Sequence, residues 1–171
     1  MSRGCFNGVL AAGLACLPAM LLGGCASTRG EAGEVHAFLD SWHNAASRAD
    51  KEAYFGRIAS DGIFLGTDDT ERWTLTEFRQ DYEGYFDSGR GWTFVPHDRK
   101  VNIERPGLAW FDELLDSEHL GVCRGSGVVR REGGQWVIVQ YNLSVPIPNE
   151  MVDTLVPMIN QHRAARKPAQ P

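Results

Sequence analysis

The order of the predicted secondary-structure elements constrains the fold of this chain more than any other feature. Apolar residues recur at helical spacing over residues 34–49, and Asp50 then caps a shorter helix that carries Tyr54, Phe55 and Ile58. A short buried strand at residues 62–66 leads to a third helix. Four longer strands follow at residues 92–103, 107–115, 119–131 and 135–145. Helices first and consecutive antiparallel strands afterwards indicate an α+β domain.

The third helix has a well-defined predicted start. Thr74 is followed three residues later by Glu77, which is the pattern of a capping box, and the helix is expected to run to Phe86. A further helix is predicted within residues 149–171, with Asn149 as its cap and a bend or break at Pro157. The tail beyond it is expected to be frayed.

The first 24 residues have the pattern of a secretory signal. Arg3 precedes an apolar run over residues 9–22, which is too short to span a bilayer as a permanent helix. The run ends in Leu-Gly-Gly-Cys at residues 22–25, which resembles the lipobox of bacterial lipoproteins. That resemblance implies cleavage before Cys25 and lipidation of it, for example with palmitate, whereas a plain cleaved signal is the alternative. Because residue 26 is Ala and not Asp, the resemblance favours the outer membrane, facing the periplasm, if the source is a diderm bacterium.

The predicted organisation is a signal peptide (1–24), a lipidated Cys with a tether (25–33), one domain (34–148) and a C-terminal helix with its tail (149–171). Cys5 and Cys16 leave with the signal, so Cys123 is the free thiol of the domain, and its strand-like surroundings predict that it is buried and inert.

The charge of the chain limits its partners. The formal net charge is −5 at pH 7, and removal of the signal makes the balance more acidic by one. An acidic domain is poorly suited to nucleic acid or to anionic lipid surfaces. We therefore expect membrane attachment through the lipid anchor only, a small-molecule ligand as partner, no nucleic acid, and a homodimer as a further possibility.

Two segments carry a resemblance to a known family. Residues 66–73 read Gly-Thr-Asp-x-x-Glu-x-Trp, and residues 144–149 read Ser-x-Pro-x-Pro-Asn. Together with the order of elements over residues 34–148, they resemble SnoaL-like domains of the nuclear transport factor 2-like superfamily, which includes ketosteroid isomerase. The resemblance implies three N-terminal helices packed in the concave face of a strongly bent antiparallel sheet, a cone-shaped, cystatin-like roll that encloses a cavity. It does not imply one activity, because the superfamily holds isomerases, dehydratases, cyclases and inert scaffolds.

The catalytic positions of ketosteroid isomerases are not retained. The position of the base falls near Gly66, which has no side chain, and the position of the tyrosine falls near Trp42, whose indole only donates. Asp68 substitutes for the base only if its loop folds inward, and Asp112 is the other candidate catalytic carboxylate. The acidic cluster around Asp68 has the alternative role of bonding loop amides and favouring the start of the next helix.

The sheet offers candidate pocket residues. Strict alternation places Trp136, Ile138 and Gln140 on one face and Tyr141 on the other, and it allows an Asp112–Arg124 pair across neighbouring strands. The alternative is a solvated or partner-covered sheet face. The candidate ligand-binding residues are Trp42, Glu71, Trp73, Trp110, Arg124, Gln140 and Tyr141.

No metal site or cofactor is predicted. His36, Asp40 and His43 share one helical face, but this face lies opposite the apolar stripe and is therefore expected to be solvated, whereas a catalytic zinc site needs an enclosed shell.

Three functions remain after these arguments. The first is binding of a small, partly apolar ligand without turnover. The second is a cofactor-independent isomerase or dehydratase, which requires a carboxylate with a shifted pKa inside the cavity. The third is a protein-interaction scaffold, which is expected to have a filled cavity and an exposed apolar patch.

Overall fold

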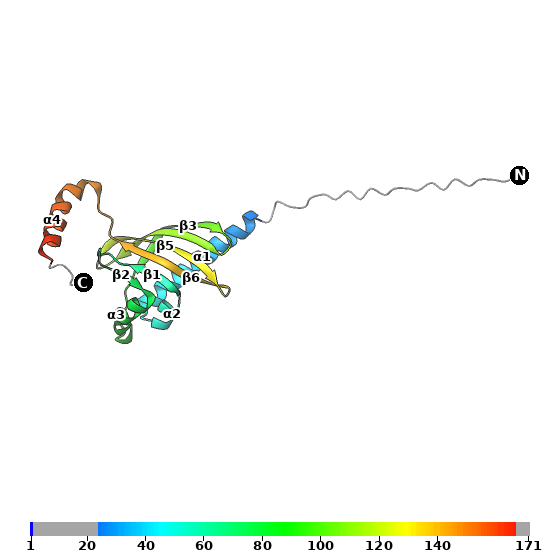
Figure 1. The fold of residues 1–171 in the computed structure, drawn as a ribbon, viewed down its shortest axis with the longest axis horizontal. Helices are drawn as coiled ribbons and strands as arrows, with labels where there is room; N and C mark the ends of the chain where they lie inside the picture. Colours follow the sequence, from blue (N-terminus) through cyan, green and yellow to red (C-terminus); the bar gives the residue numbers. More distant parts are fainter. Residues whose placement is uncertain (2–23, 167–171) are drawn as a thin grey trace.

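The computed structural model describes Met1 and residues 24–166 (Figure 1). In the second of these ranges, side chains are described from Thr28 onward. The predicted signal segment and the side chain of Cys25 lie outside the described residues. Within residues 24–166 no helix is both long enough and apolar enough to cross a membrane.

The N-terminal half contains the three predicted helices. Helix α1 spans Gly24–Ser47, so residues 26–33, which were expected to form a tether, are its first helical turns. Helix α2 spans Lys51–Phe55, and the Asp50 side chain accepts a hydrogen bond from the Ala53 amide at 3.1 Å, which confirms the predicted cap. Ile58 does not belong to this helix, because strand β1 (Ile58–Leu65) begins with it.

Helix α3 (Leu75–Asp87) begins with the predicted capping box. The Thr74 hydroxyl accepts from the Glu77 amide, and the Glu77 carboxylate accepts from the Thr74 amide at 2.8 Å. A short strand that the sequence did not predict, β2 (Arg72–Thr74), precedes the helix and pairs with β1.

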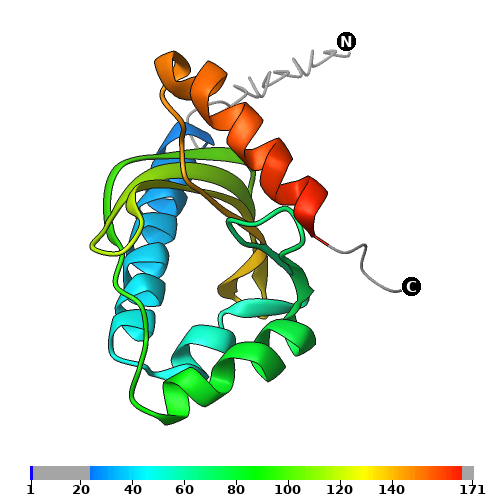
Figure 2. The same ribbon diagram turned by 90° about the vertical axis from the view of Figure 1, so that its left-hand side faces the viewer.

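One curved sheet of six strands forms the rest of the domain. Its order is β2-β1-β6-β5-β4-β3, and every neighbouring pair is antiparallel except β1 and β6, which are parallel. Helix α1 runs across the concave side of the sheet, and α2 and α3 lie at its open end (Figure 2). The predicted α+β roll is therefore confirmed. The four long strands are β3 (Val95–Arg105), β4 (Leu108–Ser117), β5 (Gly121–Glu132) and β6 (Gln135–Ser144).

Aromatic side chains from the helices and the sheet meet in the core. Phe64 of β1 stacks on Phe78 of α3 with ring centroids 4.1 Å apart, and Phe55 of α2 meets Phe78 edge-on. Cys123 is completely buried, as predicted, and burial raises the pKa of its thiol. Edge-to-face and offset ring contacts add to the stabilisation that burial of these large side chains supplies.

A bulge in β6 changes which of its residues face the core. Val128 pairs with Gln140 whereas Val129 pairs with Ile138, so Val139 is an extra residue on the β6 side. The buried residues of β6 are therefore Trp136, Ile138, Tyr141 and Leu143. Strict alternation had placed Gln140 on the face of Trp136, and the bulge moves it to the opposite face.

The C-terminal helix α4 (Val152–Ala165) lies outside the sheet and none of its residues is buried (Figure 2). A short 3-10 turn, Asn149–Met151, precedes it, so Asn149 is not its cap, and Pro157 lies inside the helix. Its end contacts the β1–β2 loop through three ion pairs: Arg163–Asp69 at 2.9 Å, Arg166–Asp68 at 3.1 Å and Arg166–Asp69 at 3.6 Å.

Candidate functional site

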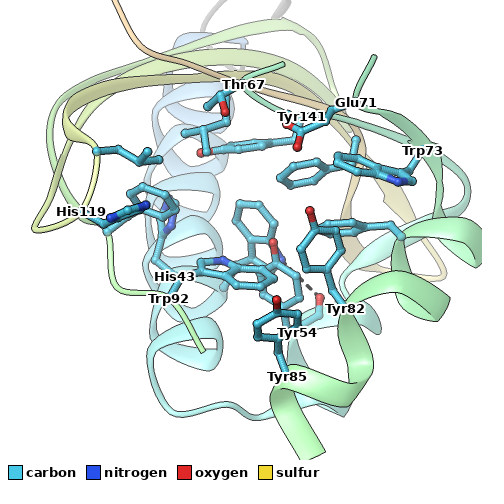
Figure 3. Close-up of a pocket in the computed structure, with 17 residues that line it drawn as sticks. His43, Tyr54, Thr67, Glu71, Trp73, Tyr82, Tyr85, Trp92, His119 and Tyr141 are labelled. Carbon is cyan, nitrogen blue, oxygen red and sulfur yellow. Dashed lines mark hydrogen bonds between the residues drawn. The ribbon is translucent and has the colours of Figure 1, made fainter. Parts of the chain in front are cut away.

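A cavity of about 460 Å³ opens between α1, α3 and the concave side of the sheet (Figure 3). Most of the side chains that line it are aromatic. They include Trp42 of α1, Tyr54 of α2, Phe78 and Tyr82 of α3, and Tyr141 of β6. The exposed side chains in its lining, Thr67, Tyr85 and His119, mark its mouth.

Four of the predicted ligand-binding residues line this cavity: Trp42, Glu71, Trp73 and Tyr141. Trp42 is buried, stacks on Tyr54 with ring centroids 4.9 Å apart, and meets Tyr141 edge-on at 4.8 Å. The Trp73 indole donates to Asp81 at 2.8 Å. These contacts hold the rings in fixed orientations as flat walls.

Glu71 occupies the space beside Gly66. Its carboxylate accepts from the Asp68 amide at 3.0 Å, and a Cβ at residue 66 would collide with it. A side chain at the position where ketosteroid isomerases have their base is thus excluded unless Glu71 moves, and Glu71 itself supplies a carboxylate to the cavity wall.

The two predicted catalytic carboxylates do not line the cavity. Hydrogen bonds from Thr70, followed by the guanidinium of Arg166, hold the pKa of Asp68 far below its usual range, so this carboxylate is ionised and engaged in its own loop. Asp112 alternates along β4 with the buried Phe111 and Glu113, so it lies on the outer face of the sheet.

The other predicted binding residues share that outer face. Trp110 is 47% exposed, Arg124 is exposed, and Gln140 pairs with Val128 outside the cavity because of the bulge in β6. Asp112 pairs in register with Ser126 while Arg124 pairs with Leu114, and within residues 28–166 no ion pair joins Asp112 to Arg124. Sequence alternation separates the two faces of a strand but does not identify the inner one, which is why these residues were misplaced.

A buried ionic network reaches the cavity through His43, which was expected on a solvated face. The His43 imidazole is 6% exposed, lines the cavity, and lies 2.8 Å from Glu113 Oε1 through Nε2. Arg99 donates through Nε to Glu113 Oε2 at 2.7 Å and through Nη1 to Asp40 at 2.8 Å. The rest of the domain therefore buries more of the surface of helix α1 than its apolar residues alone predict. The buried part includes His43. Among the described residues no three His, Cys, Asp or Glu side chains converge as metal ligands.

The ionisation of Glu113 follows from its two partners. Burial alone would raise the pKa of this carboxyl, but the hydrogen bond and charge of His43 and those of Arg99 outweigh burial and lower it. Glu113 is therefore a carboxylate that accepts hydrogen bonds at both oxygens.

Two tyrosine hydroxyls are buried in the cavity wall, those of Tyr54 and Tyr141. The Tyr54 hydroxyl interacts with Trp92, whereas the Tyr141 hydroxyl has no hydrogen-bond partner among the described residues. Burial raises the pKa of both phenols well above the usual value and outweighs the opposite effect of the Trp92 hydrogen bond at Tyr54, so both remain protonated donors. The Tyr141 hydroxyl lies against Gly125, where any Cβ would collide with it and crowd Glu113. Unpaired buried donors are rare in folded proteins and suit a bound acceptor.

One signal in the sequence indicated Glu113. It alternates with the apolar residues Ala109, Phe111 and Leu115 along one strand, which places a carboxyl on the buried face, where it requires a partner. The partner itself was not predictable, since His43 is 70 residues away and Arg99 comes from a different strand.

Comparisons with known proteins support the fold. No curated protein sequence matches the chain. A nuclear transport factor 2-like protein of unknown function from Pseudomonas putida is similar in structure, with a TM-score of 0.60, 17% identity, and coverage of 72% of this chain and 92% of that one. A Novosphingobium aromaticivorans protein named as a candidate scytalone dehydratase has a TM-score of 0.60 at 10% identity, over 71% of this chain and 88% of that one.

A third similar structure has a name of a different kind. A Xanthomonas campestris domain, named as a candidate calcium/calmodulin-dependent protein kinase II association domain, has a TM-score of 0.54 at 23% identity, over 79% of this chain and 94% of that one. Identities this low establish the fold and not the activity. A family model described as a SnoaL-like domain matches residues 35–148, and the chain therefore belongs to the SnoaL-like domain family.

Proposed function

We propose that this protein is a lipid-anchored protein of the bacterial cell envelope whose SnoaL-like domain binds a small, largely apolar molecule. The observation that supports binding is the open cavity of about 460 Å³ with mostly aromatic walls. Small-molecule sites are typically concave and apolar, with a few polar groups that orient the ligand. Here the polar groups are His43, Glu71 and the buried hydroxyls of Tyr54 and Tyr141. A flat ring system with one or two polar groups suits this lining.

A substitution at the mouth tests this proposal. The protein used is the chain from residue 25 onward, which contains every described helix and strand except the first residue of α1. It is incubated with a mixed lipid and metabolite extract. We expect native mass spectrometry to show a captured small molecule. Thr67→Trp, which adds a large ring to an exposed position of the lining, should weaken capture at least about tenfold, equivalent to about 1.4 kcal/mol.

Thr93→Trp is the matched control, because Thr93 is also exposed but does not line the cavity. This variant should capture the small molecule to the same extent as the wild type. A clean apo mass for the wild type, or equal capture by both variants, would contradict binding in this cavity.

The lipid anchor is proposed from the residues at positions 22–25 and the apolar run before them. The full chain is expressed in a diderm host that is given alkyne-tagged palmitate. We expect the protein to carry the label and to be found in the outer-membrane fraction. Cys25→Ser should abolish the label, whereas Cys123→Ser, which removes a buried thiol, should leave it intact. Label that survives Cys25→Ser would exclude this anchor.

A cofactor-independent isomerase or dehydratase is the second candidate function. The observation that favours it is the His43–Glu113 hydrogen bond at the cavity wall, because an imidazole oriented by a carboxylate is a common proton-transfer group. The name of the Novosphingobium structure agrees with such chemistry for that protein. Asp68 and Asp112 no longer serve as candidate bases, since both lie outside the cavity lining.

A further inference from the structure

A second pocket, of about 520 Å³, lies between the β3–β4 turn, the β5–β6 turn and the first turns of helix α1. It shares no residue with the aromatic cavity. The start of α1 and the end of β3 lie together at one end of the sheet, and α4 lies at the other end (Figure 1). The charged side chains in its lining are those of Glu31, Arg105, Arg130 and Arg131, so this pocket suits a polar ligand.

The carboxylate of Glu31 is satisfied at one oxygen only. Its side chain is 14% exposed, and Oε1 accepts from the Gly107 amide at 3.2 Å and lies 3.9 Å from Arg131 Nη2. Oε2 is buried and has no hydrogen-bond partner among the residues that the structure describes. A buried carboxylate oxygen without a donor is unfavourable. Glu31 Oε2 therefore suits a donor group on a bound molecule.

One of the three arginines in the lining is free to bind an anion. Arg131 is ion-paired with Glu34, and Arg130 is ion-paired with Asp61 at 2.6 Å. Arg105 is exposed, and its side chain forms no hydrogen bond or ion pair within residues 28–166. Guanidinium groups bind phosphate oxygens through two parallel N–H donors. Arg105 therefore suits a phosphate group.

The two unengaged charges of the second pocket are opposite in sign and do not neutralise each other. In the described part of the chain no ion pair joins Glu31 to Arg105, so their charged atoms are more than 4.0 Å apart. A simple anion in this pocket would be repelled by Glu31, and a simple cation would be repelled by Arg105. A group that carries both a phosphate and an ammonium matches both side chains.

The position of Glu31 on α1 indicates where such a group comes from. Glu31 is six residues after Cys25 in the same helix, which is about 9 Å along the helix axis. We infer that the second pocket binds the phosphoethanolamine headgroup of a phospholipid, with the phosphate on Arg105 and the ammonium on Glu31 Oε2. The inference is independent of the aromatic cavity, but its location at a membrane surface rests on the proposed anchor at Cys25.

Soluble headgroup compounds test the recognition without a membrane. The chain from residue 25 onward, without lipid, is titrated with glycerophosphoethanolamine, with glycerophosphoglycerol, which lacks the ammonium, and with inorganic phosphate. The Gly107 amide, followed in ¹H–¹⁵N spectra, reports binding because it donates to Glu31. We expect glycerophosphoethanolamine to bind at least about fivefold more tightly than glycerophosphoglycerol, a modest value for a hydrogen bond between charged groups.

Two variants separate the contributions of the two charges. Glu31→Gln keeps an oxygen for the Gly107 amide but loses the negative charge, so it should remove the preference for glycerophosphoethanolamine. Arg105→Gln should weaken the binding of both compounds by a similar factor. Glu104→Gln is the matched control, because Glu104 is exposed beside Arg105 but does not line the pocket, and it should bind as the wild type does.

Three results would overturn the recognition. They are equal binding of the two headgroup compounds by the wild type, equal effects of Glu31→Gln and Glu104→Gln, and binding of inorganic phosphate as tightly as glycerophosphoethanolamine. The last of these would reassign the pocket to a simple anion.

Sedimentation with vesicles tests the lipid source. The same unlipidated chain should sediment with vesicles of equal parts phosphatidylethanolamine and phosphatidylcholine more than with phosphatidylcholine alone, because a trimethylammonium group has no N–H to donate to Glu31. Glu31→Gln should lose this difference. Binding of glycerophosphoethanolamine without any such difference between vesicles would contradict a phospholipid as the source. Since Cys25 carries no lipid in these measurements, failure of headgroup binding is distinguishable from failure of the anchor, which the palmitate label reports.

Discussion

Glu113→Ala should lower the free energy of unfolding by about 3–5 kcal/mol, the usual range when one partner of a buried ion pair is removed. The physical reason is the guanidinium of Arg99, whose side chain is 6% exposed and whose Nη2 is already unpaired among the described residues. Without Glu113, Arg99 would retain only the exposed Asp40 and the His36 carbonyl as partners. Urea unfolding followed by circular dichroism measures the loss.

Asp112→Ala is the matched control, since Asp112 is the preceding residue of the same strand but lies on the outer face. It should change the free energy of unfolding by about 0.5 kcal/mol or less. The double variant Arg99→Met with Glu113→Leu should recover much of the loss, because it removes both charges. Equal effects of Glu113→Ala and Asp112→Ala would show that the network does not stabilise the fold.

Replacement of Glu113 should change how the free energy of unfolding depends on pH in the acid range. The pKa of the Glu113 carboxyl is lower in the folded state than in the unfolded state. Its contribution to the free energy of unfolding is therefore complete at a pH above its pKa in the unfolded state, and is lost as the pH falls through its pKa in the folded state. Wild-type stability should therefore decrease toward acid more steeply than that of Glu113→Ala.

Trp42→Ala should cost about 3–5 kcal/mol of unfolding free energy, as large-to-small changes of core aromatic residues do. Trp42 is 1% exposed, stacks on Tyr54, contacts Tyr141 edge-on, and donates its indole N–H to the Tyr54 carbonyl at 3.2 Å. Its removal deletes the ring that connects α1 to two other walls of the cavity. Thermal and urea unfolding measure the effect, and capture of a small molecule, followed by native mass spectrometry, should weaken as well.

Trp110→Ala provides the comparison, because Trp110 carries the same side chain on the outer face at 47% exposure. We expect a change of about 1 kcal/mol or less in the free energy of unfolding, as is usual for surface substitutions, and unaltered capture of the small molecule. Both tryptophans were predicted to bind ligand from the sequence, so the pair also tests the assignment of the inner face. A larger effect from Trp110→Ala than from Trp42→Ala would contradict that assignment.

The parts of the fold that local rules determine were predictable. Helical spacing predicted α1, the Asp50 cap located α2, and the Thr74–Glu77 capping box located α3. The bulge in β6 was not predictable from the sequence. The alternation of apolar and polar residues in this strand is irregular, so one extra residue cannot be recognised in it. Strand β2 was missed because three residues carry too little pattern.

The candidate site was predictable where it depends on a local motif. Glu71 and Trp73 belong to one short segment beside Gly66, and both line the cavity. The His43–Glu113–Arg99 network combines one residue each from α1, β4 and β3, and it depends on how the sheet curves around the helix. Such an arrangement follows from tertiary packing, which the order of residues along the chain does not specify.

The continuity of α1 has a consequence for how the protein is placed. From Cys25 to His43 the backbone is one helix, and at 1.5 Å per residue this distance is about 27 Å. If Cys25 is lipidated as we propose, this helix limits the distance between the bilayer and the cavity to about 27 Å. The cavity is then held near the membrane without being part of it, so a ligand that comes from the bilayer would have to leave it to enter the cavity.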